Sequence, residues 1–238
     1  MEPSFVSPAV PVRPRGLSSL IGDALRRPGG RKALSVLSVV LFVAGVAMFA
    51  YPVGTDLYSR YKQGQLGSAF GDPKLQEKYL THTIGVGDVL TRLEIPKIKL
   101  DVLVVEGTTP AALRAGAGHY PSTPLPGELG NVGIAGHRTT FGRPFNHLDE
   151  MAPGDEVILI TPFKKYHYIA DNNFDNHANP WVTNPKDFTV VQNVAGQYLL
   201  TLTTCNPKGS AKQRLVLRLQ LHPELTEDVI AKKKGAAS

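Results

Sequence analysis

The hydrophobic and polar residues follow five different patterns along the chain. Residues 1–32 are mostly polar, and residues 33–52 form a nearly continuous apolar run. Residues 53–87 are mixed, whereas residues 88–222 alternate short apolar runs with turn-forming residues. Residues 223–238 are polar again. The pattern predicts a disordered basic N-terminus, a transmembrane anchor, a stalk, one folded domain and a solvated tail.

The apolar run has the length of a helix that spans a bilayer. From Ala33 to Ala50 it contains no charge and no proline. About twenty such residues make ~30 Å of helix, which matches the hydrocarbon core. A buried core helix would carry a polar face, and a cleavable signal peptide would have a shorter run nearer to the start of the chain. We therefore predict an uncleaved anchor, with cleavage near Ala47 as the open alternative.

Most of the excess positive charge precedes the anchor. Residues 1–32 hold six basic and two acidic residues, and so carry +4 of the formal net charge of +6. Because positive flanks favour the cytoplasmic side, we predict a single-pass protein of the cell membrane with a cytoplasmic N-terminus and an extracellular domain. The remaining chain has little net charge, which argues against binding to nucleic acid.

The folded domain has the pattern of a mainly all-β protein with short helices. Turn signals separate the strands, and strands do not alternate with helices, so a closed β-barrel or a sandwich is expected. The expected strands are 91–105 with a break at Pro96, 130–135, 156–161, 166–170, 188–192, 198–204 and 215–221. A short helix is expected at 109–115, and a long loop at 171–187.

The stalk is expected to form helical turns interrupted by glycine. The helical turns are predicted at residues 55–66 and 73–80. Gly64, Gly67 and Gly71 are predicted to break them, because glycine is unfavourable inside a helix.

The chain contains one cysteine, Cys205, so an internal disulfide is impossible. A solitary thiol is either an inert buried group or a reactive one. Cys205 ends the alternating run 198–204, and a turn at 206–210 follows it. This places the thiol at the rim of a sheet, with Arg214 nearby across the turn. Accessibility and a neighbouring cation are typical of reactive cysteines.

A reactive thiol needs a proton acceptor or a cationic partner, because a free thiol is mostly protonated at neutral pH. Seven histidines are available in the sequence. His137 follows the apolar run 130–135 directly after Gly136, which also predicts a position at a sheet rim; a turn histidine is the alternative. His119 is the second candidate, with a structural role as its alternative. The sequence contains no P-loop, no HExxH and no CxxC motif.

Separated motifs in the domain resemble those of the sortase family. Residues 201–205, TLTTC, and Arg214 in the run RLVL resemble the sortase signature TLxTC…R. Residues 130–138, GNVGIAGHR, resemble the segment that ends in the catalytic histidine of sortases. The likeness extends over residues 88–221, behind an N-terminal anchor.

The resemblance implies an eight-stranded sortase-type β-barrel and a cysteine transpeptidase. Cys205 is then the nucleophile that attacks the Thr–Gly bond of a C-terminal sorting signal and forms a thioacyl intermediate. His137 protonates the leaving amine and then deprotonates the incoming nucleophile, while Arg214 holds the peptide and stabilises the oxyanion. The implied partners are sorting signals of surface proteins, an amine of a peptidoglycan precursor, and the cell membrane.

Two short stretches are most similar to class E sortases, the housekeeping type of actinobacteria. These are Gly-His-Tyr-Pro at 118–121 and Cys-Asn-Pro-Lys-Gly-Ser at 205–210. Class E implies a LAxTG-like signal in place of LPxTG, with Tyr120 reading the second position; a core tyrosine is the alternative. Thr204 is implied to line the site, with an ordinary strand threonine as the alternative. Trp181 is implied to flank the peptide groove.

No cofactor and no metal are expected. Some sortases bind calcium, but Asp171, Asp175 and Glu128 lack the spacing of an ion-binding loop. Three alternatives remain open: a membrane-anchored cysteine hydrolase acting on the same signal, a pilin-polymerising sortase, and a non-catalytic binding module tethered to the membrane. The aspartate-aromatic lid motif of pilin-polymerising sortases is not evident, and residues 71–73 are only faintly similar to it.

Overall fold

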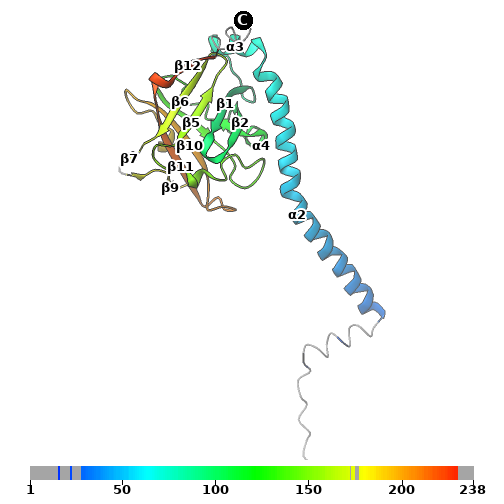
Figure 1. Ribbon diagram of the computed structural model, residues 1–238. Helices are drawn as coiled ribbons and strands as arrows, with labels where there is room; N and C mark the ends of the chain where they lie inside the picture. The colour runs from blue at the N-terminus through cyan, green and yellow to red at the C-terminus, as the bar shows by residue number, and fades with distance from the viewer. Residues whose placement is uncertain (1–15, 17–21, 23–27, 172, 175–176, 230–238) are drawn as a thin grey trace, which may run out of the picture. The chain divides into compact units, whose positions relative to one another are not determined.

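The protein is described by a computed structural model, which covers residues 16, 22, 28–171, 173–174 and 177–229 (Figure 1). Two compact units are distinguished, Met1–Tyr51 and Pro52–Ser238. Helix α2, Pro28–Phe70, contains the predicted anchor and extends beyond it at both ends. Its mean hydropathy reaches 2.5, so by length and composition it is a candidate membrane span. Most of the predicted disordered segment 1–32 lies outside the described residues.

The stalk differs from the prediction, because α2 continues without a break to Phe70. It passes through Gly64 and Gly67, so the breaks predicted there are wrong. A glycine costs a helix only about 1 kcal/mol relative to alanine, and apolar packing outweighs that cost here. Leu66 and Phe70 pack against a small cluster formed by the buried side chains of Leu75, Val89 and Leu103.

The helices and strands follow the expected order closely. The helices after α2 are α3 (Pro73–Leu80) and α4 (Pro110–Ala115), and the 3-10 turns are η1 (Pro96–Ile98), η2 (Leu148–Glu150), η3 (Thr189–Val191) and η4 (Pro223–Leu225). The strands are β1 (Val89–Ile95), β2 (Leu100–Glu106), β3 (Ala117–His119), β4 (Gly130–Ala135), β5 (Glu156–Ile160), β6 (Lys164–Ala170), β7 (Asn173–Phe174), β8 (His177–Ala178), β9 (Trp181–Thr183), β10 (Tyr198–Asn206), β11 (Gln213–Leu221) and β12 (Glu227–Asp228).

Eight strands close into a barrel, which confirms the predicted fold class (Figure 1). Their order is β6-β5-β1-β2-β3-β4-β10-β11, and β11 closes the barrel by pairing with β6. Neighbouring strands run antiparallel, except that β2 with β3 and β4 with β10 are parallel. The short strands β12 and β9 add to the edges of β6 and β11.

The barrel core is filled by alternate residues of the strands. On β10 the inward side chains include those of Leu200 and Leu202, which are fully buried. Because side chains alternate across a strand, Thr201, Thr203 and Cys205 lie on the opposite, outer face of β10. The outer face at this end of the barrel therefore carries the thiol.

The strand predicted at 188–192 is wrong, because this segment forms the 3-10 turn η3. Val190 and Val191 are adjacent, and both are buried against Val216 of β11. An alternating strand would turn one of them away, whereas a single helical turn buries both. Asp187 supports the turn by accepting a hydrogen bond from the Thr189 backbone N–H at 3.1 Å.

The long loop and the tail are more ordered than predicted. Residues 171–187 include β9, which pairs with β11 over Trp181–Thr183. The tail begins with η4 and β12, and β12 pairs with β6 over Glu227 and Asp228. The tail beyond residue 229 lies outside the described residues.

Candidate active site

The strand register places His137 and Cys205 at the same end of two neighbouring strands. β4 and β10 run parallel, with Ala135 opposite Thr203. β4 ends at Ala135, two residues before His137, whereas β10 continues through Cys205 to Asn206. On the other side of β10, Arg214 of β11 is the direct cross-strand partner of Cys205. The three residues predicted from the sequence are thus brought together on adjacent strands, with Cys205 between the other two.

The segment that leads into His137 is tightly fixed to β10. The Gly136 N–H donates to the Thr203 carbonyl at 3.1 Å, and the Thr204 hydroxyl donates to the Gly136 carbonyl at 2.8 Å. Glycine is required at position 136, because a Cβ there would lie 2.7 Å from the buried ring of Phe145. The Phe145 N–H also donates to the His137 carbonyl at 3.1 Å.

Arg138 is a buried residue of the site that the sequence analysis missed. It is 4% exposed, and its Nη1 donates to the Cys205 carbonyl at 3.2 Å and to the Asn206 side chain at 2.7 Å. Its Nη2 pairs with Asp149 at 3.0 Å. The residue next to His137 therefore binds the backbone of Cys205 directly. Its position directly after His137 could have drawn attention to it, but the sequence could not show that it binds the Cys205 carbonyl.

Replacement of Arg138 with alanine is expected to lower the free energy of unfolding by about 2–3 kcal/mol, since a buried guanidinium and its part-buried acceptors lose their hydrogen bonds. The full-length protein should then melt ~5–10 °C earlier, because the two strand ends are no longer tied together. Lys208→Ala is a matched control: its ammonium lies 3.6 Å from the same Asp149, but the pair is exposed and is worth at most about 1 kcal/mol. Equal melting temperatures for the two variants would contradict the assignment.

The thiol of Cys205 is partly exposed, as a reactive cysteine requires. The guanidinium of Arg214 is held by its own hairpin: Nη1 donates to the carbonyls of Ala211 and Gln213 at 3.1 and 3.0 Å. Both bonds are exposed to solvent, so other acceptors can compete for the guanidinium.

His137 lies against the ring of Phe141, with 5.3 Å between the ring centroids. The guanidinium of Arg114, on α4, lies 5.8 Å from the centre of the same Phe141 ring. Burial, and to a lesser extent the positive charge of Arg114, lower the pKa of His137 below its ordinary value. Both effects disfavour the imidazolium, so the neutral imidazole is the favoured form at neutral pH.

The two predicted substrate-binding residues occupy different positions. Tyr120 reaches the outer face of β10, where its hydroxyl lies 3.0 Å from the Thr203 hydroxyl. Gly133 makes room for it, since a Cβ there would lie 2.9 Å from the Tyr120 ring. Thr204, in contrast, is 3% exposed and bonds Gly136 on the side of β10 opposite to Cys205. Thr203 is the threonine that shares a face with the thiol.

A small apolar cluster lies on the outer face beside Tyr120. It combines Val190 and Val191 of η3 with Val216 of β11, and Tyr120 and Trp181 pack against it. The guanidinium of Arg218 lies 5.4 Å from the centre of the Trp181 ring. Trp181, predicted to flank the peptide, is thus fixed on the outer face of the same strands that carry Cys205 and Arg214.

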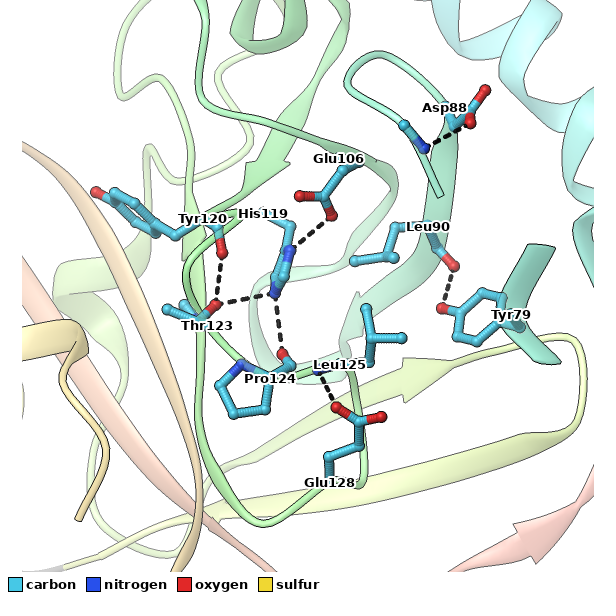
Figure 2. Close-up of polar contacts among 12 residues, drawn as sticks. Tyr79, Asp88, Leu90, Glu106, His119, Tyr120, Thr123, Pro124, Leu125 and Glu128 are labelled. Atoms are coloured by element: carbon cyan, nitrogen blue, oxygen red, sulfur yellow. Dashed lines mark hydrogen bonds and ion pairs between the residues drawn. The ribbon is translucent and has the colours of Figure 1, made fainter. Parts of the chain in front are cut away.

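His119, the second histidine candidate, is part of a buried network with Glu106, Thr123 and Pro124 (Figure 2). Its side chain is 1% exposed, and its Nδ1 lies 2.7 Å from the Glu106 carboxylate. Its Nε2 lies 3.0 Å from the Pro124 carbonyl and 2.9 Å from the Thr123 hydroxyl. Thr123 also accepts a hydrogen bond from the Gly133 N–H at 3.0 Å. The network fixes the loop after Tyr120, which supports the structural interpretation of His119.

Within the described residues, no group of three or more His, Cys, Asp or Glu side chains is placed to hold a metal ion. Asp175 lies outside those residues. Glu128 instead closes its own turn, where its carboxylate accepts from the Leu125 N–H at 2.9 Å.

A closed barrel that brings a thiol, an imidazole and a guanidinium to neighbouring strand ends is the arrangement of a cysteine acyl-transfer enzyme. The sortase domain family matches residues 93–222 of this chain. The chain belongs to the sortase family, whose members are cysteine transpeptidases.

Relatives of class E are prominent among the similar proteins. Sortase SrtE1 of Streptomyces coelicolor is 27% identical over 212 residues, which cover 81% of this chain and 58% of SrtE1. Its structure with a tripeptide in the active site matches with a TM-score of 0.51 and 28% identity, covering 59% of this chain and 90% of that one. This chain thus spans little more than half of the full SrtE1 sequence.

Two further structures share the fold. Sortase E from Streptomyces avermitilis matches with a TM-score of 0.54 and 31% identity, covering 62% of this chain and 95% of that one. Sortase D5 from Clostridium perfringens, described as a transpeptidase, matches with a TM-score of 0.58 and 26% identity, covering 69% and 98%. The chain is therefore a sortase most similar to class E.

Proposed function

We propose that this protein cleaves a LAxTG- or LPxTG-like C-terminal sorting signal between Thr and Gly and transfers the acyl part to an amine of the cell wall. The observation that supports the proposal is the register of three strands, in which Cys205 pairs with Arg214, and Thr203 pairs with Ala135, two residues before His137. The tripeptide in the active site of S. coelicolor SrtE1 supports a peptide as the substrate.

The first half of the reaction forms a thioester. The sulfur of Cys205 attacks the threonine carbonyl as the neutral imidazole of His137 takes the thiol proton. The tetrahedral intermediate then expels the glycine amine, which receives that proton from His137. The C–N bond breaks, the C–S bond remains, and His137 is neutral again.

The second half is the reverse of the first, with a different amine. The incoming amine attacks the thioester carbonyl and loses a proton to His137. The intermediate collapses to a new amide, and the sulfur leaves as a thiolate that recovers the proton from His137. The parallel pairing of β4 with β10 keeps the two side chains on adjacent strand ends through both halves.

Arg214 supplies positive charge to the peptide carbonyl at which the oxyanion develops. In the free protein its Nη1 is bonded to the carbonyls of Ala211 and Gln213. We propose that it exchanges these acceptors for the substrate when the peptide binds. A planar guanidinium suits this role better than an ammonium, because it keeps its charge and offers several donors in a fixed geometry.

Tyr120 contacts the residue at the second position of the signal. Its ring lies over Gly133 and its hydroxyl is fixed by Thr203, two residues before the nucleophile on the same face. For Thr204 we propose an indirect role. Its hydroxyl is bonded to the Gly136 carbonyl beside His137, so it fixes the backbone of the site and does not itself touch the substrate.

The apolar helix holds the enzyme at the cell membrane, where the transpeptidation partners meet. We propose that residues 33–52 cross the bilayer once, that residues 1–32 are cytoplasmic, and that residues 88–222 form the catalytic domain outside. The excess of positive charge in residues 1–32 supports this orientation. Surface proteins with C-terminal signals and a peptidoglycan precursor with a free amine are then available on the same side.

The test uses the full-length protein in detergent, a LAxTG peptide, an LPxTG peptide and a glycine peptide as the amine. Mass spectrometry should show the new amide with the glycine peptide and the cleaved acid without it. Faster turnover of the LAxTG peptide is expected if Tyr120 favours a small second residue.

If the cleaved acid is the only product at every amine concentration, the protein is a hydrolase and not a transferase. Transfer to a lysine side chain of a pilin-like peptide in preference to the glycine peptide would favour a pilin-polymerising enzyme. No cleavage of either signal would point to a binding module.

A further inference from the structure

The loop that follows His137 has an unusual backbone. Phe141, Gly142 and Arg143 have φ angles of 51°, 77° and 49°, so three consecutive residues are in the left-handed region. Side chains other than glycine rarely adopt this conformation, because the Cβ crowds the backbone. Such a loop keeps its shape only when its surroundings hold it.

The part of α2 beyond Pro52 supplies that support. The Asp56 carboxylate accepts from the Gly142 N–H at 3.0 Å and pairs with Arg143 Nη2 at 2.9 Å. Ser59, one turn further along, is buried, and a Cβ at position 142 would lie 2.8 Å from its hydroxyl oxygen. A single carboxylate on α2 thus binds both the middle and the last residue of the left-handed loop.

Phe141, the first residue of the loop, contacts both α2 and His137. The Phe141 ring makes an edge contact with Tyr58 of α2 at 6.4 Å between centroids. The Phe141 ring also lies 5.3 Å from the His137 ring and 5.8 Å from the Arg114 guanidinium. Phe141 therefore lies between α2 and the imidazole, and its ring covers part of the imidazole from water.

The same helix is fixed to the barrel by a second group of contacts. The Gln63 side chain donates to the carbonyls of Leu103 and Ala115 at 3.0 and 2.8 Å, and it accepts from the Leu103 N–H at 2.8 Å. Ala115 directly follows Arg114 in α4, so the bond from Gln63 of α2 also fixes the end of α4 that carries Arg114. Tyr58 and Arg114, the two side chains beside Phe141, are therefore both positioned by α2. The helix is thus fixed both at the barrel wall and at the loop.

We propose that residues 52–63 of α2 form a positioning element of the active site, in which Asp56 holds the left-handed loop and Phe141 presses against His137. From the sequence, this segment was predicted only to be part of a stalk. The inference rests on the proposed function in that His137 is the acid–base residue. Asp56 and Phe141 act through His137, so they are positioning residues.

Four full-length variants in detergent test the proposal. Asp56→Ala removes both bonds to the loop, and Asp56→Asn keeps the size of the side chain and one acceptor for the Gly142 N–H. Phe141→Ala removes the cover on the imidazole. Lys62→Ala is the control, because Lys62 lies in the same stretch of helix but its ammonium bonds Gln65 of that helix and not the loop. The readouts are the NMR titration of a labelled His137 and kcat and KM for the LAxTG peptide.

The expected result is a His137 titration that moves to higher pH in Asp56→Ala and Phe141→Ala, less in Asp56→Asn, and not in Lys62→Ala. The reason is that burial is the main cause of its lowered pKa, and the facing positive charge of Arg114 is retained. We expect kcat to fall roughly tenfold in the two alanine variants with little change in KM, because a small displacement of a catalytic group slows the chemical step.

An unchanged titration and an unchanged kcat in folded Asp56→Asn and Phe141→Ala would overturn the proposal. The NMR titration does not depend on turnover, so it decides this inference even where the proposed function fails. Conversely, His137→Ala can lose activity while the Asp56 and Phe141 variants change neither the titration nor kcat. That result would support the proposed function and reject the positioning element.

Discussion

Replacement of Cys205 with alanine is expected to abolish peptide cleavage and transfer, with a loss of at least ~10⁴-fold in kcat/KM. Cys205 is the only cysteine of the chain, so no other thiol can form the thioester. The substitution removes a partly exposed side chain at a strand end. The barrel should therefore keep its melting temperature, and the loss should be chemical and not structural.

The measurement is intact-protein mass spectrometry after a short reaction with the LAxTG peptide and no amine. The wild-type protein should gain the mass of the acyl fragment, and Cys205→Ala should gain none. Cys205→Ser is the matched control, because it keeps the size and one proton but offers a much weaker nucleophile. An acyl adduct on Cys205→Ala, or transfer at a rate close to wild type, would rule out the proposed mechanism.

Local signals in the sequence were sufficient for most of the barrel. Pro96 predicted the break between β1 and β2, and the structure has the turn η1 there. Thr109 followed by Pro110 predicted the start of a short helix, and the Thr109 side chain accepts from the Ala112 N–H at 3.2 Å. Both features depend on neighbours in sequence, which is why a single sequence shows them.

The features that the sequence did not show all depend on long-range contacts. Arg138 can donate to the Cys205 carbonyl because β4 and β10 pair in parallel. Asp56 meets Gly142 across eighty-six positions of the chain. The turn η3 forms because Val216 offers a surface on which two adjacent valines are buried. The motifs identified the reacting residues, and tertiary packing determined which residues hold them.

The threonines before the nucleophile show the same difference between what local sequence predicts and what the folded strand determines. The alternating run 198–204 predicted a half-buried strand. β10 forms there, but its residues 199–204 are buried on both faces. The strand alternates, so Thr203 faces outward with Cys205 and Thr204 faces inward. The resemblance implied that Thr204, the residue before the cysteine in sequence, lines the site, with an ordinary strand threonine as the alternative. On a strand, the residue two positions away is the neighbour on the same face.

Replacement of His137 with alanine is expected to lower kcat/KM about 10³-fold, since it removes the group that accepts and returns the proton in both halves of the reaction. The wild-type profile of kcat/KM against pH should have an acid limb with a midpoint below the ordinary histidine value of about 6.5. The sign follows from the lowered pKa: burial and Arg114 both disfavour the imidazolium. As pH falls through this pKa, His137 becomes protonated and can no longer accept the thiol proton.

Two comparisons make the assignment specific to His137. His119→Gln perturbs a buried network around Glu106 and Pro124, so it should lower the melting temperature without moving the acid limb. His137→Ala should keep the melting temperature and lose the acid limb, because its half-buried ring contributes chemistry more than packing. An acid limb that persists in His137→Ala, or one centred at or above pH ~7 in the wild type, would assign the proton transfer to another group.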